Sequence, residues 1–583
     1  MLERSREFAE HAALEQRWGR IRLQGAGRYR RLLTVDNLAG TVRRLSSRRR
    51  FDAIVVGGGH NGLVAAFDLA SAGLSTIVLE RRPFVGGACV TEEFAPGFRA
   101  SSGAYVLSML RRSIWRDMRL VERGIRVDPA GPTLNVYPDA AHLWLDDDLD
   151  RTVEDVKRLS PADAAAFPRF ERDLAAVGRA VTPVFERTPP SVAPRSVHEF
   201  LELAAYGRLA LAHRKVLADA AFVFTASMTQ FLDEYFSSPH VAAALGWHAV
   251  NDSVSGPSSP GTAYVLLHDH ASEDAEGGVR QWGFVRGGIG RVTEAMADAV
   301  RERGGEIRTD AEVDAIVTNG DAVAGVRLAS GEELQAPIVV SNADPKRTFL
   351  SLCADAPLPS EFVDRIQAYR CEGTSIKINL ALSSLPAVAG QPAGTGPQPY
   401  HYGIMEVSPF LADLDRHQAD ARSGVAADPA HIEICFPTVH DPSLAPDGKH
   451  VATIDVNSQP YSLTDGGWDA VREDRADRAI AQLEAYFPGL SGMIEHRQVL
   501  TPLDLERQLG LTGGHALHGE MSAEQLFLLR PVRGWGRYRT PLRGLYLCGA
   551  GTHPGGGVTG ANGRNAAREI VRDAGRSRRR ASR

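Results

Sequence analysis

Residues 51–62 read Phe51-Asp-Ala-Ile-Val-Val56-Gly57-Gly58-Gly59-His60-Asn61-Gly62, and this stretch decides the fold. Its apolar first half predicts a short strand of a buried parallel sheet. The residues that follow, 63–72, carry Val, Ala and Leu at helical spacing, and 75–79 form a second apolar run that ends at Glu80. The order of strand, glycine turn, helix, strand and acid predicts a Rossmann-type βαβ unit that binds a dinucleotide.

Three glycines of the turn satisfy the pattern GxGxxG. Gly57 permits a tight turn, Gly59 lets the backbone approach a pyrophosphate, and Gly62 lets the helix pack closely on the strand. The N-terminus of that helix would face the phosphates. Glu80 lies eighteen residues beyond Gly62 and is placed to accept hydrogen bonds from the adenosine ribose. An acid at this place disfavours the 2′-phosphate of NADP.

The continuation Glu80-Arg81-Arg82-Pro-Phe-Val-Gly86-Gly87 resembles the extended fingerprint of the flavin amine oxidase and phytoene desaturase superfamily. The resemblance implies FAD rather than NAD as the dinucleotide. It also implies that the glycine pair lies beside the pyrophosphate and that Arg81 or Arg82 approaches the phosphates. By their place in the turn, His60 and Asn61 are expected to contact the cofactor.

A second glycine-rich turn lies near the other end of the chain, Gly549-Ala-Gly551-Thr-His553-Pro-Gly-Gly-Gly557-Val558. An apolar strand precedes it, and a helix of small residues is predicted to start near Val558, which makes this turn another anion or polar-ring site. The segment resembles the C-terminal FAD motif of phytoene desaturase-like proteins. Together with the first turn it looks closest to the group of pyridine nucleotide-disulphide oxidoreductase domain-containing protein 2 and its bacterial relatives. By that resemblance, His553 contacts flavin or pyrophosphate.

The same turn departs from bacterial carotene desaturases at two positions. In those proteins the sequence of the turn is similar to Thr-His-Pro-Gly-Ala-Gly-Val-Pro-Gly, whereas this chain has Gly556 in place of the alanine and Thr559 in place of the second proline. The change is compatible with FAD binding and weakens the expectation of a carotenoid substrate. Segment 513–526 also resembles a part of the family that lies close to the flavin.

Between the two turns, residues 306–344 alternate short strands with turns and predict the small sheet that this superfamily inserts after its first βαβ unit. By resemblance, the backbone of Val313 contacts adenine. The expected fold is therefore α/β, with a discontinuous Rossmann-type FAD-binding domain at residues 51–103, 284–349 and 500–572. An α+β substrate domain is expected at 104–283 and 350–499, between a basic N-terminal extension (1–50) and a basic tail (573–583).

The substrate domain combines predicted helices and strands. Apolar residues recur at roughly 3.6-residue spacing in three stretches, whereas 374–382, 431–436 and 451–456 look like strands that floor an active site. The notably apolar stretch 216–228 is interpreted as a core helix, with a tunnel wall or a membrane contact as alternatives. The predicted helices are Phe170–Val181, Val197–Leu211 and Arg214–Phe236.

Catalytic residues are not identified by any motif. Lys377 resembles the lysine that holds a water near flavin N5 in amine oxidases, and an ordinary strand lysine is the alternative. Tyr105 follows the FAD fingerprint and either reaches the flavin or packs. His553 is the third candidate.

Composition narrows the class of protein. The chain has 583 residues, a formal net charge of −5, 43% hydrophobic and 23% charged residues, which is the balance of an ordinary globular protein with no expected nucleic-acid partner. No apolar run reaches the length of a membrane span, and peripheral membrane contact and oligomerisation are left open.

Five separated cysteines without a CxxC pair predict free thiols, no metal site and a cytoplasmic location. If the chain is eukaryotic, the resemblance implies the mitochondrial matrix as an alternative. A targeting peptide, a disordered extension and a start site placed too far upstream all remain open for residues 1–50.

These observations predict an FAD-dependent oxidoreductase that moves hydride from a C–H bond of a small, largely apolar substrate to flavin N5. The electron acceptor is oxygen, a quinone or another carrier. Disulphide reductase chemistry is unsupported because a second dinucleotide fingerprint and a redox cysteine pair are both missing from the sequence. The alternatives are a carotenoid or polyene desaturase or isomerase and, from another class, an FAD-binding regulatory protein with little turnover.

Overall fold

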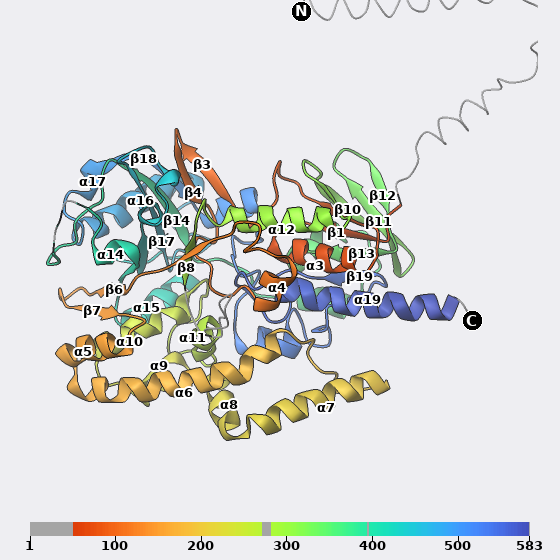
Figure 1. Ribbon diagram of the computed structural model, residues 1–583, viewed down its shortest axis with the longest axis horizontal. Coiled ribbons are helices and arrows are strands. Elements are labelled where there is room, and N and C mark those ends of the chain that lie inside the picture. Colours follow the sequence, from red (N-terminus) through yellow and green to blue (C-terminus); the bar gives the residue numbers. More distant parts are fainter. Residues whose placement is uncertain (1–49, 271–281, 393, 395, 582–583) are drawn as a thin grey trace, which may run out of the picture. The chain divides into compact units, whose positions relative to one another are not determined.

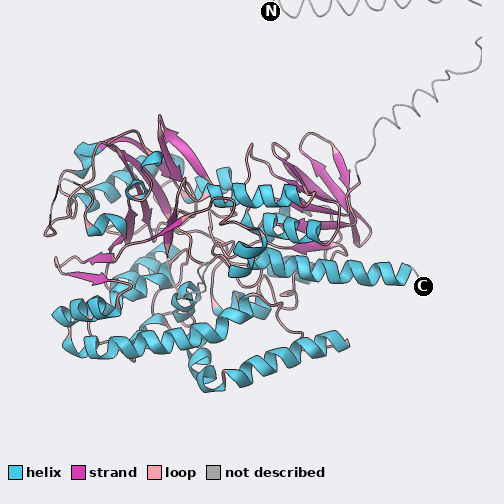
Figure 2. Cartoon of the chain, in the orientation of Figure 1, coloured by secondary structure: helices cyan, strands magenta, loops and turns pink. Residues whose placement is uncertain are grey.

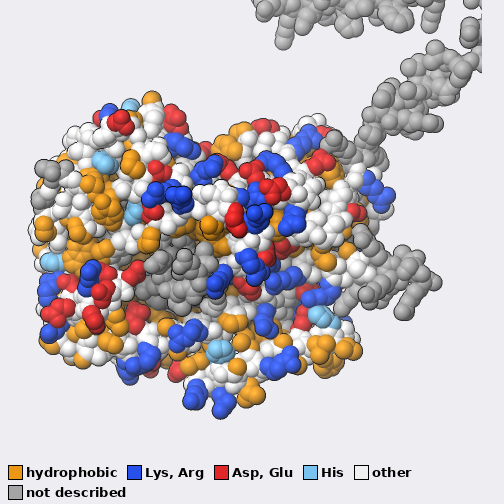
Figure 3. All heavy atoms as spheres, in the orientation of Figure 1, with side chains coloured by type: hydrophobic (Ala, Val, Ile, Leu, Met, Phe, Trp, Pro, Cys, Tyr) orange, Lys and Arg blue, Asp and Glu red, His pale blue; other side chains and the backbone are white. Residues whose placement is uncertain are grey.

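The computed structural model describes residues 50–270, 282–392, 394 and 396–581. The N-terminal extension up to residue 49 therefore lies outside the described residues. In the described chain, a parallel sheet with its helices, at the right of Figure 1, stands beside a larger mixed sheet, and a layer of helices runs below both (Figures 1 and 2). On the face shown in Figure 3, Lys and Arg side chains are interspersed with Asp and Glu side chains.

The parallel sheet has five strands that come from three distant parts of the chain. β1 lies in its centre and pairs in parallel with β13 on one side and β2 on the other, with Ala53 opposite Ile338 and Thr76. Segments far apart in the sequence thus form one sheet, and the predicted α/β fold with a discontinuous Rossmann-type unit is confirmed. In spatial order the strands are β19 (Leu545–Leu547), β13 (Ile338–Ser341), β1 (Ala53–Val56), β2 (Thr76–Leu79) and β9 (Glu306–Arg308).

Alternate side chains of β1 enter two different cores because successive residues of a strand point to opposite faces. Ala53 and Val55 pack against three helices, whereas Ile54 and Val56 pack against the small antiparallel sheet β10-β11-β12. The whole strand is buried, which explains why its sequence is continuously apolar rather than alternating. The helices are α3 (His60–Ser71), α12 (Gly290–Glu302) and α19 (Ala561–Ala581), and the small sheet is β10 (Val313–Asn319), β11 (Ala322–Leu328) and β12 (Glu333–Gln335).

Two expectations for this region differ from the structure. Residues 306–308 were expected in the small sheet, but β9 pairs in parallel with β2, because α12 returns the chain to the open edge of that strand. Helix α19 begins at Ala561 rather than near Val558 and runs through Ala581, so most of the predicted tail is helical. The boundaries between an FAD-binding and a substrate domain stay a prediction.

The mixed sheet has one apolar face and one polar face. The apolar face packs on α16 (Trp468–Glu484) and α17 (Leu490–Met493) in a core that contains Ile378, Ile434 and Ile454. In spatial order its strands are β18 (Ile494–Leu500), β14 (Ile376–Leu382), β17 (His450–Val456), β16 (Ile432–Cys435), β15 (Ile404–Val407), β6 (Thr133–Val136) and β7 (His142–Leu145).

One predicted helix of the helical layer, Arg214–Phe236, is divided in the structure. The stretch 214–236 does not form one helix, because Ser227 caps a new helix through a capping box with Gln230. Val223 is the one buried residue of α8, Phe222 and Phe224 are partly buried in the same core, and Leu217 is exposed, so α8 is not the core helix that the sequence predicted. The main helices are α5 (Leu149–Leu159), α6 (Pro161–Phe185), α7 (Val197–Ala212), α8 (Leu217–Thr225), α9 (Met228–Asp233), α10 (Pro239–Gly246) and α11 (Ala263–His270).

Smaller elements connect these layers. Two antiparallel pairs, β3 with β4 and β5 with β8, lie between the sheets. Among the helices of the described residues, none combines the length and the hydropathy that a membrane span requires. The bounds are β3 (Thr91–Ala95), β4 (Phe98–Ser101), β5 (Val127–Pro129), β8 (Gly283–Val285), α4 (Arg112–Asp117), α13 (Ser360–Gln367), α14 (Pro399–Tyr402), α15 (Leu411–Arg422) and α18 (Pro502–Asp504).

A fully buried arginine ties the C-terminal turn to the segment before it. The Arg530 guanidinium donates hydrogen bonds to the carbonyl oxygens of Leu517, Gly519, Glu520, Gln525 and Ala550, at 2.8–3.2 Å. Five carbonyl groups inside the protein are therefore satisfied by one side chain.

We predict that Arg530→Met lowers the free energy of unfolding by about 3–5 kcal/mol, because it leaves several buried carbonyl groups without a donor. Urea denaturation followed by circular dichroism measures the change. Arg533→Met is the matched control, because the Arg533 side chain is exposed, and a change within about 0.5 kcal/mol is expected there. Equal effects of the two substitutions would contradict the structural role of Arg530.

Candidate active site

One cavity extends from the glycine turn after β1 to the polar face of the mixed sheet. It is lined by residues of β1, β2, β10, β14, β16 and β17 and of the loops that follow them. Of the predicted site residues, those that line it are Gly57, Gly59, His60, Asn61, Glu80, Arg81, Arg82, Gly87, Tyr105, Val313, Lys377, Gly557 and Val558.

The turn after β1 leaves no space for side chains. Gly57 has a φ of +96°, and a Cβ on Gly62 would lie 2.3 Å from the Gly57 carbonyl oxygen. A Cβ on Gly59 would lie 2.8 Å from Nδ2 of Asn342. Helix α3 begins directly after Gly59 without a side-chain cap, so its first backbone N–H groups are left to an outside acceptor. These groups form a cradle that could hold a pyrophosphate.

Glu80 closes this cradle from the end of β2. Its side chain is buried; Oε2 accepts a hydrogen bond from the Gly58 backbone N–H at 2.7 Å and Oε1 one from the Arg82 N–H at 2.9 Å. The carboxylate is thereby held at the cavity wall. A carboxylate has further acceptor sites for ribose hydroxyl groups.

The two arginines of the fingerprint line the cavity but also contact protein groups. Arg81 donates to the carbonyl oxygens of Arg507 and Gln508, at 3.0 and 2.7 Å. Arg82 forms an ion pair with Glu92 at 2.6 Å. A phosphate contact by either arginine remains a prediction.

Five predicted residues do not line the cavity: Gly62, Gly86, Gly549, Gly551 and His553. The glycines provide close packing behind it; a Cβ on Gly549 would lie 2.6 Å from the Asn342 carbonyl oxygen. His553 is turned away, with Nε2 3.0 Å from the carbonyl oxygen of Val184. Burial lowers the pKa of His553 to about 4. His553 is thus placed as a neutral packing residue rather than as a group that faces the cavity.

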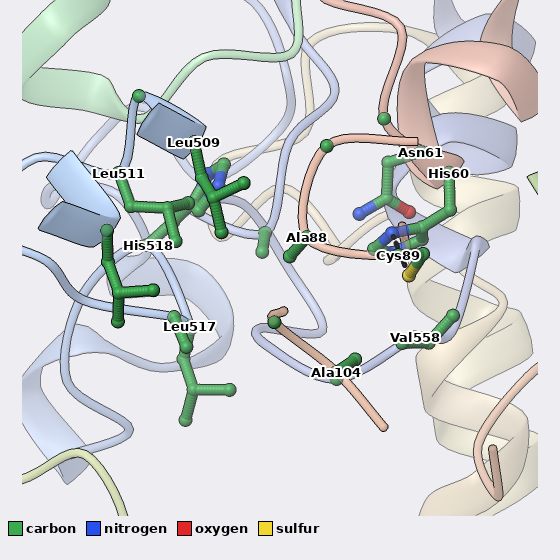
Figure 4. Close-up of a pocket in the computed structure, with 18 of the residues that line it drawn as sticks. His60, Asn61, Ala88, Cys89, Ala104, Leu509, Leu511, Leu517, His518 and Val558 are labelled. Carbon is green, nitrogen blue, oxygen red and sulfur yellow. Dashed lines mark hydrogen bonds between the residues drawn. The ribbon is translucent and has the colours of Figure 1, made fainter. Parts of the chain in front are cut away.

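Figure 4 shows two opposing walls of the cavity. At one end, His60 and Cys89 approach each other, with Nδ1 and Sγ 3.7 Å apart, and Val558 lies beside them. Burial lowers the pKa of His60 to about 4, so its imidazole is neutral at physiological pH. Across the cavity lie Leu517 and His518, which come from the segment 513–526 that the sequence placed near the flavin.

Lys377 lies at the far end of the cavity on β14. Its Nζ is 3.4 Å from the centroid of the Tyr105 ring and 3.8 Å from Oδ2 of Asp455, and it has no hydrogen-bond partner. Burial lowers the pKa of Lys377 to about 8. The two catalytic candidates Lys377 and Tyr105 are therefore brought together, whereas His553 lies elsewhere.

Sequence reasoning missed several polar residues of the cavity. Asp252 has its pKa raised to about 6 and Glu433 to about 8, mainly by burial. Asp455 also lines this end, with a raised pKa and the same main cause. The signal was an alternation of apolar and polar residues at Ile376–Asn379 of β14, Ile432–Ile434 of β16 and Thr453–Val456 of β17, which marks one polar sheet face.

The described residues fit FAD. A glycine turn at a helix N-terminus, an acid at the end of β2 and a second glycine turn at Gly557 line one continuous cavity, and a second dinucleotide fingerprint is missing from the sequence. Within the described residues, no cluster of side chains that could hold a metal ion is found. The fold and the site define the class of FAD-dependent oxidoreductases.

The chain belongs to the family of flavin containing amine oxidoreductases, whose model matches residues 62–571. It is 38% identical to pyridine nucleotide-disulfide oxidoreductase domain-containing protein 2 of Rattus norvegicus, over 90% of this chain and 94% of the relative. It is also 27% identical to a limonene dehydrogenase polypeptide of Castellaniella defragrans, over 91% of this chain and 96% of the relative. These matches confirm the predicted family and the predicted cofactor class.

Solved structures share the fold. An oxidoreductase from Methanosarcina mazei superimposes with a TM-score of 0.54 at 17% identity, covering 89% of this chain and 99% of that structure. A putrescine oxidase variant gives a TM-score of 0.55 at 15% identity, covering 90% of this chain and 98% of that structure.

We predict that Gly62→Ala weakens FAD binding about tenfold or more, a loss of roughly 1.4 kcal/mol, because the new methyl group pushes the Gly57 carbonyl out of the cradle. Titration of the apoprotein with FAD, followed by flavin fluorescence, measures the affinity. Gly207→Ala is the matched control, since a Cβ there meets nothing within 4 Å. Unchanged affinity in Gly62→Ala would show that the cradle does not hold the cofactor.

Proposed function

We propose that this FAD-dependent oxidoreductase removes hydride from a C–H bond of a largely apolar small molecule and delivers it to flavin N5. The observation that carries the proposal is that the dinucleotide cradle and Lys377 line the same cavity. A bound FAD would supply the two-electron chemistry, while the protein binds, orients and excludes water.

The glycine cradle and Glu80 would hold the adenosine and pyrophosphate half of the cofactor. Gly557 and Val558 of the second glycine turn line the same cavity beside His60, where they would approach the cofactor. Apolar side chains that line the cavity include Met109, Val265 and Leu517. They support a substrate that buries hydrocarbon surface.

A polyene or other hydrocarbon substrate is the second candidate. It is favoured by the names of two relatives, the limonene dehydrogenase polypeptide and the phytoene desaturase of Cereibacter sphaeroides, which is 27% identical. A pure hydrocarbon would leave Lys377 Nζ and Glu433 Oε1 without a hydrogen-bond partner at the end of the cavity. A substrate with a polar group satisfies them, so we favour an amphipathic molecule.

An anaerobic screen tests the proposal. The FAD-loaded protein is mixed with amines, alcohols, polyenes and acyl compounds, and loss of the oxidised flavin absorbance identifies a hydride donor. We expect bleaching by an amphipathic member of the set. Protein that cannot be loaded with FAD contradicts the proposed function, and FAD-loaded protein that no donor bleaches favours an FAD-binding regulatory role.

Lys377 is predicted to accept the proton that leaves the substrate. Its ammonium form cannot accept a proton, so the rate of flavin bleaching is expected to rise with pH through a midpoint of about 8. Lys377→Met should remove this rise and slow bleaching by about 10²–10⁴. Stopped-flow absorbance with a donor from the screen measures both. Lys449→Met, which alters a partly exposed lysine directly before β17, should leave the pH profile unchanged.

A further inference from the structure

Four ionisable side chains form a row across the mixed sheet. Asp455 lies opposite Lys377 on one side and opposite Glu433 on the other, and Glu433 lies opposite Glu406. All three strand pairs are antiparallel, so directly opposed side chains share a face with Cβ atoms about 4.5–5.5 Å apart. We call Lys377, Asp455, Glu433 and Glu406 the polar row.

The polar row is buried and incompletely satisfied. Lys377 is 4%, Glu433 5% and Glu406 1% exposed. Lys377 Nζ and Glu433 Oε1 have no hydrogen-bond partner, and Glu406 is paired with His431 at 3.2 Å. Because burying ionisable groups without full hydrogen bonding is costly, such a row calls for a function other than stability.

The polar row joins two cavities. Lys377, Asp455 and Glu433 line the cavity that holds the FAD cradle. Glu433 and Glu406 line a second cavity between the mixed sheet and the helices α5 and α6. Glu433, Trp247 and Trp282 line both and thus form the wall between them.

The second cavity reaches the surface. Asp147, Leu149 and Arg172 line it and are exposed. The polar row therefore leads from the active-site end at Lys377, through the wall at Glu433, to a compartment in contact with solvent.

The proposed oxidation produces a proton that has to leave. Conversion of a single bond to a double bond removes hydride from one atom and a proton from its neighbour. Both electrons leave with the hydride for the flavin, and the proton stays behind in an enclosed cavity. A neutral Lys377 amine can accept it, and carboxyl groups within reach of one another can pass it on.

We propose that the polar row is a proton path from Lys377 to the second cavity, with Glu433 as the group that carries the proton through the wall. This inference rests on the proposed function and adds an exit route to it. In the path, Lys377 gives its proton to Asp455, the carboxyl groups relay it, and Glu406 releases it to water. No bond other than those to the transferred proton forms or breaks.

The surroundings of Glu433 suit a proton carrier. Burial and Asp455 raise the pKa of Glu433 to about 8, so that the carboxyl group is protonated at neutral pH and still able to release its proton. The titratable groups around it are Asp455 and Glu406 on the adjacent strands, Cys435 on its own strand, His431 directly before that strand, and Lys377, Asp252 and His248 around the two cavities.

The path is tested by proton release without any substrate. The FAD-loaded protein is reduced electrochemically and mixed anaerobically with ferricyanide, which takes electrons and no protons. Two ferricyanide ions oxidise each reduced flavin, and the proton freed from flavin N5 would enter the path at Lys377. Flavin absorbance reports oxidation, and a pH indicator in weak buffer reports the proton. We expect Glu433→Gln to slow proton release about tenfold or more relative to Glu495→Gln, which makes the same change at an exposed carboxylate of the same sheet.

A second readout needs no redox change. Infrared difference spectra of the oxidised, FAD-loaded protein should contain the C=O band of a protonated carboxyl group that titrates near pH 8. The band should be absent in Glu433→Gln and present in Glu495→Gln. If Glu433→Gln does not fold, Glu406→Gln, which lies next in the row, replaces it in the kinetic experiment with the same expected slowing.

The outcomes separate the two proposals. Proton release by Glu433→Gln at the control rate, in protein that retains FAD, overturns the path and leaves the proposed function intact. A carboxyl group ionised throughout the titration also overturns the path. Protein that retains no FAD contradicts the proposed function, and the path fails with it because no reaction then supplies a proton to Lys377.

Discussion

The space around Asn342 sets the geometry on which the site depends. Three glycines surround Asn342. A Cβ added to Gly57 would lie 3.4 Å from Cβ of Asn342, one added to Gly59 would lie 2.8 Å from its Nδ2, and one added to Gly549 would lie 2.6 Å from its carbonyl oxygen. The ends of β1, β13 and β19 therefore converge on one asparagine. Space demands glycine at positions 59 and 549, and a φ of +96° demands it at position 57. This convergence brings together the turns from three distant segments, and with them the cofactor cradle.

The sequence predicted this half of the molecule well because its constraints are local. A φ of +96°, as at Gly57, requires a glycine at that one position, and this glycine can be recognised in the sequence. The acid at the end of β2 can be recognised in the same way. Features decided by packing between distant parts were harder to predict. His553 stands in a cofactor-like motif, but its Nε2 approaches the Val184 carbonyl oxygen and it does not line the cavity, so its cofactor contact stays a prediction. The place of β9 was predicted wrongly, because β9 pairs with the open edge of β2.

The polar end of the cavity could not be predicted from local sequence in this way. The strands β14, β16 and β17 were predicted, and their alternation was visible, but Lys377, Asp455 and Glu433 lie up to 78 residues apart in the chain. Only the register of the strands places them opposite one another. Because register depends on pairing across the whole sheet, a single sequence does not reveal it.

The discontinuity of the parallel sheet also governs the order in which this protein can mature. During synthesis β1 and α3 emerge early, but β19 and α19 are made only from residue 545 onward. Until then α3 lacks α19, which packs along it, and β13 keeps a free edge. A nascent chain therefore exposes apolar surface and a strand edge for most of its translation, and FAD binding to the finished site has to wait for the synthesis of α19.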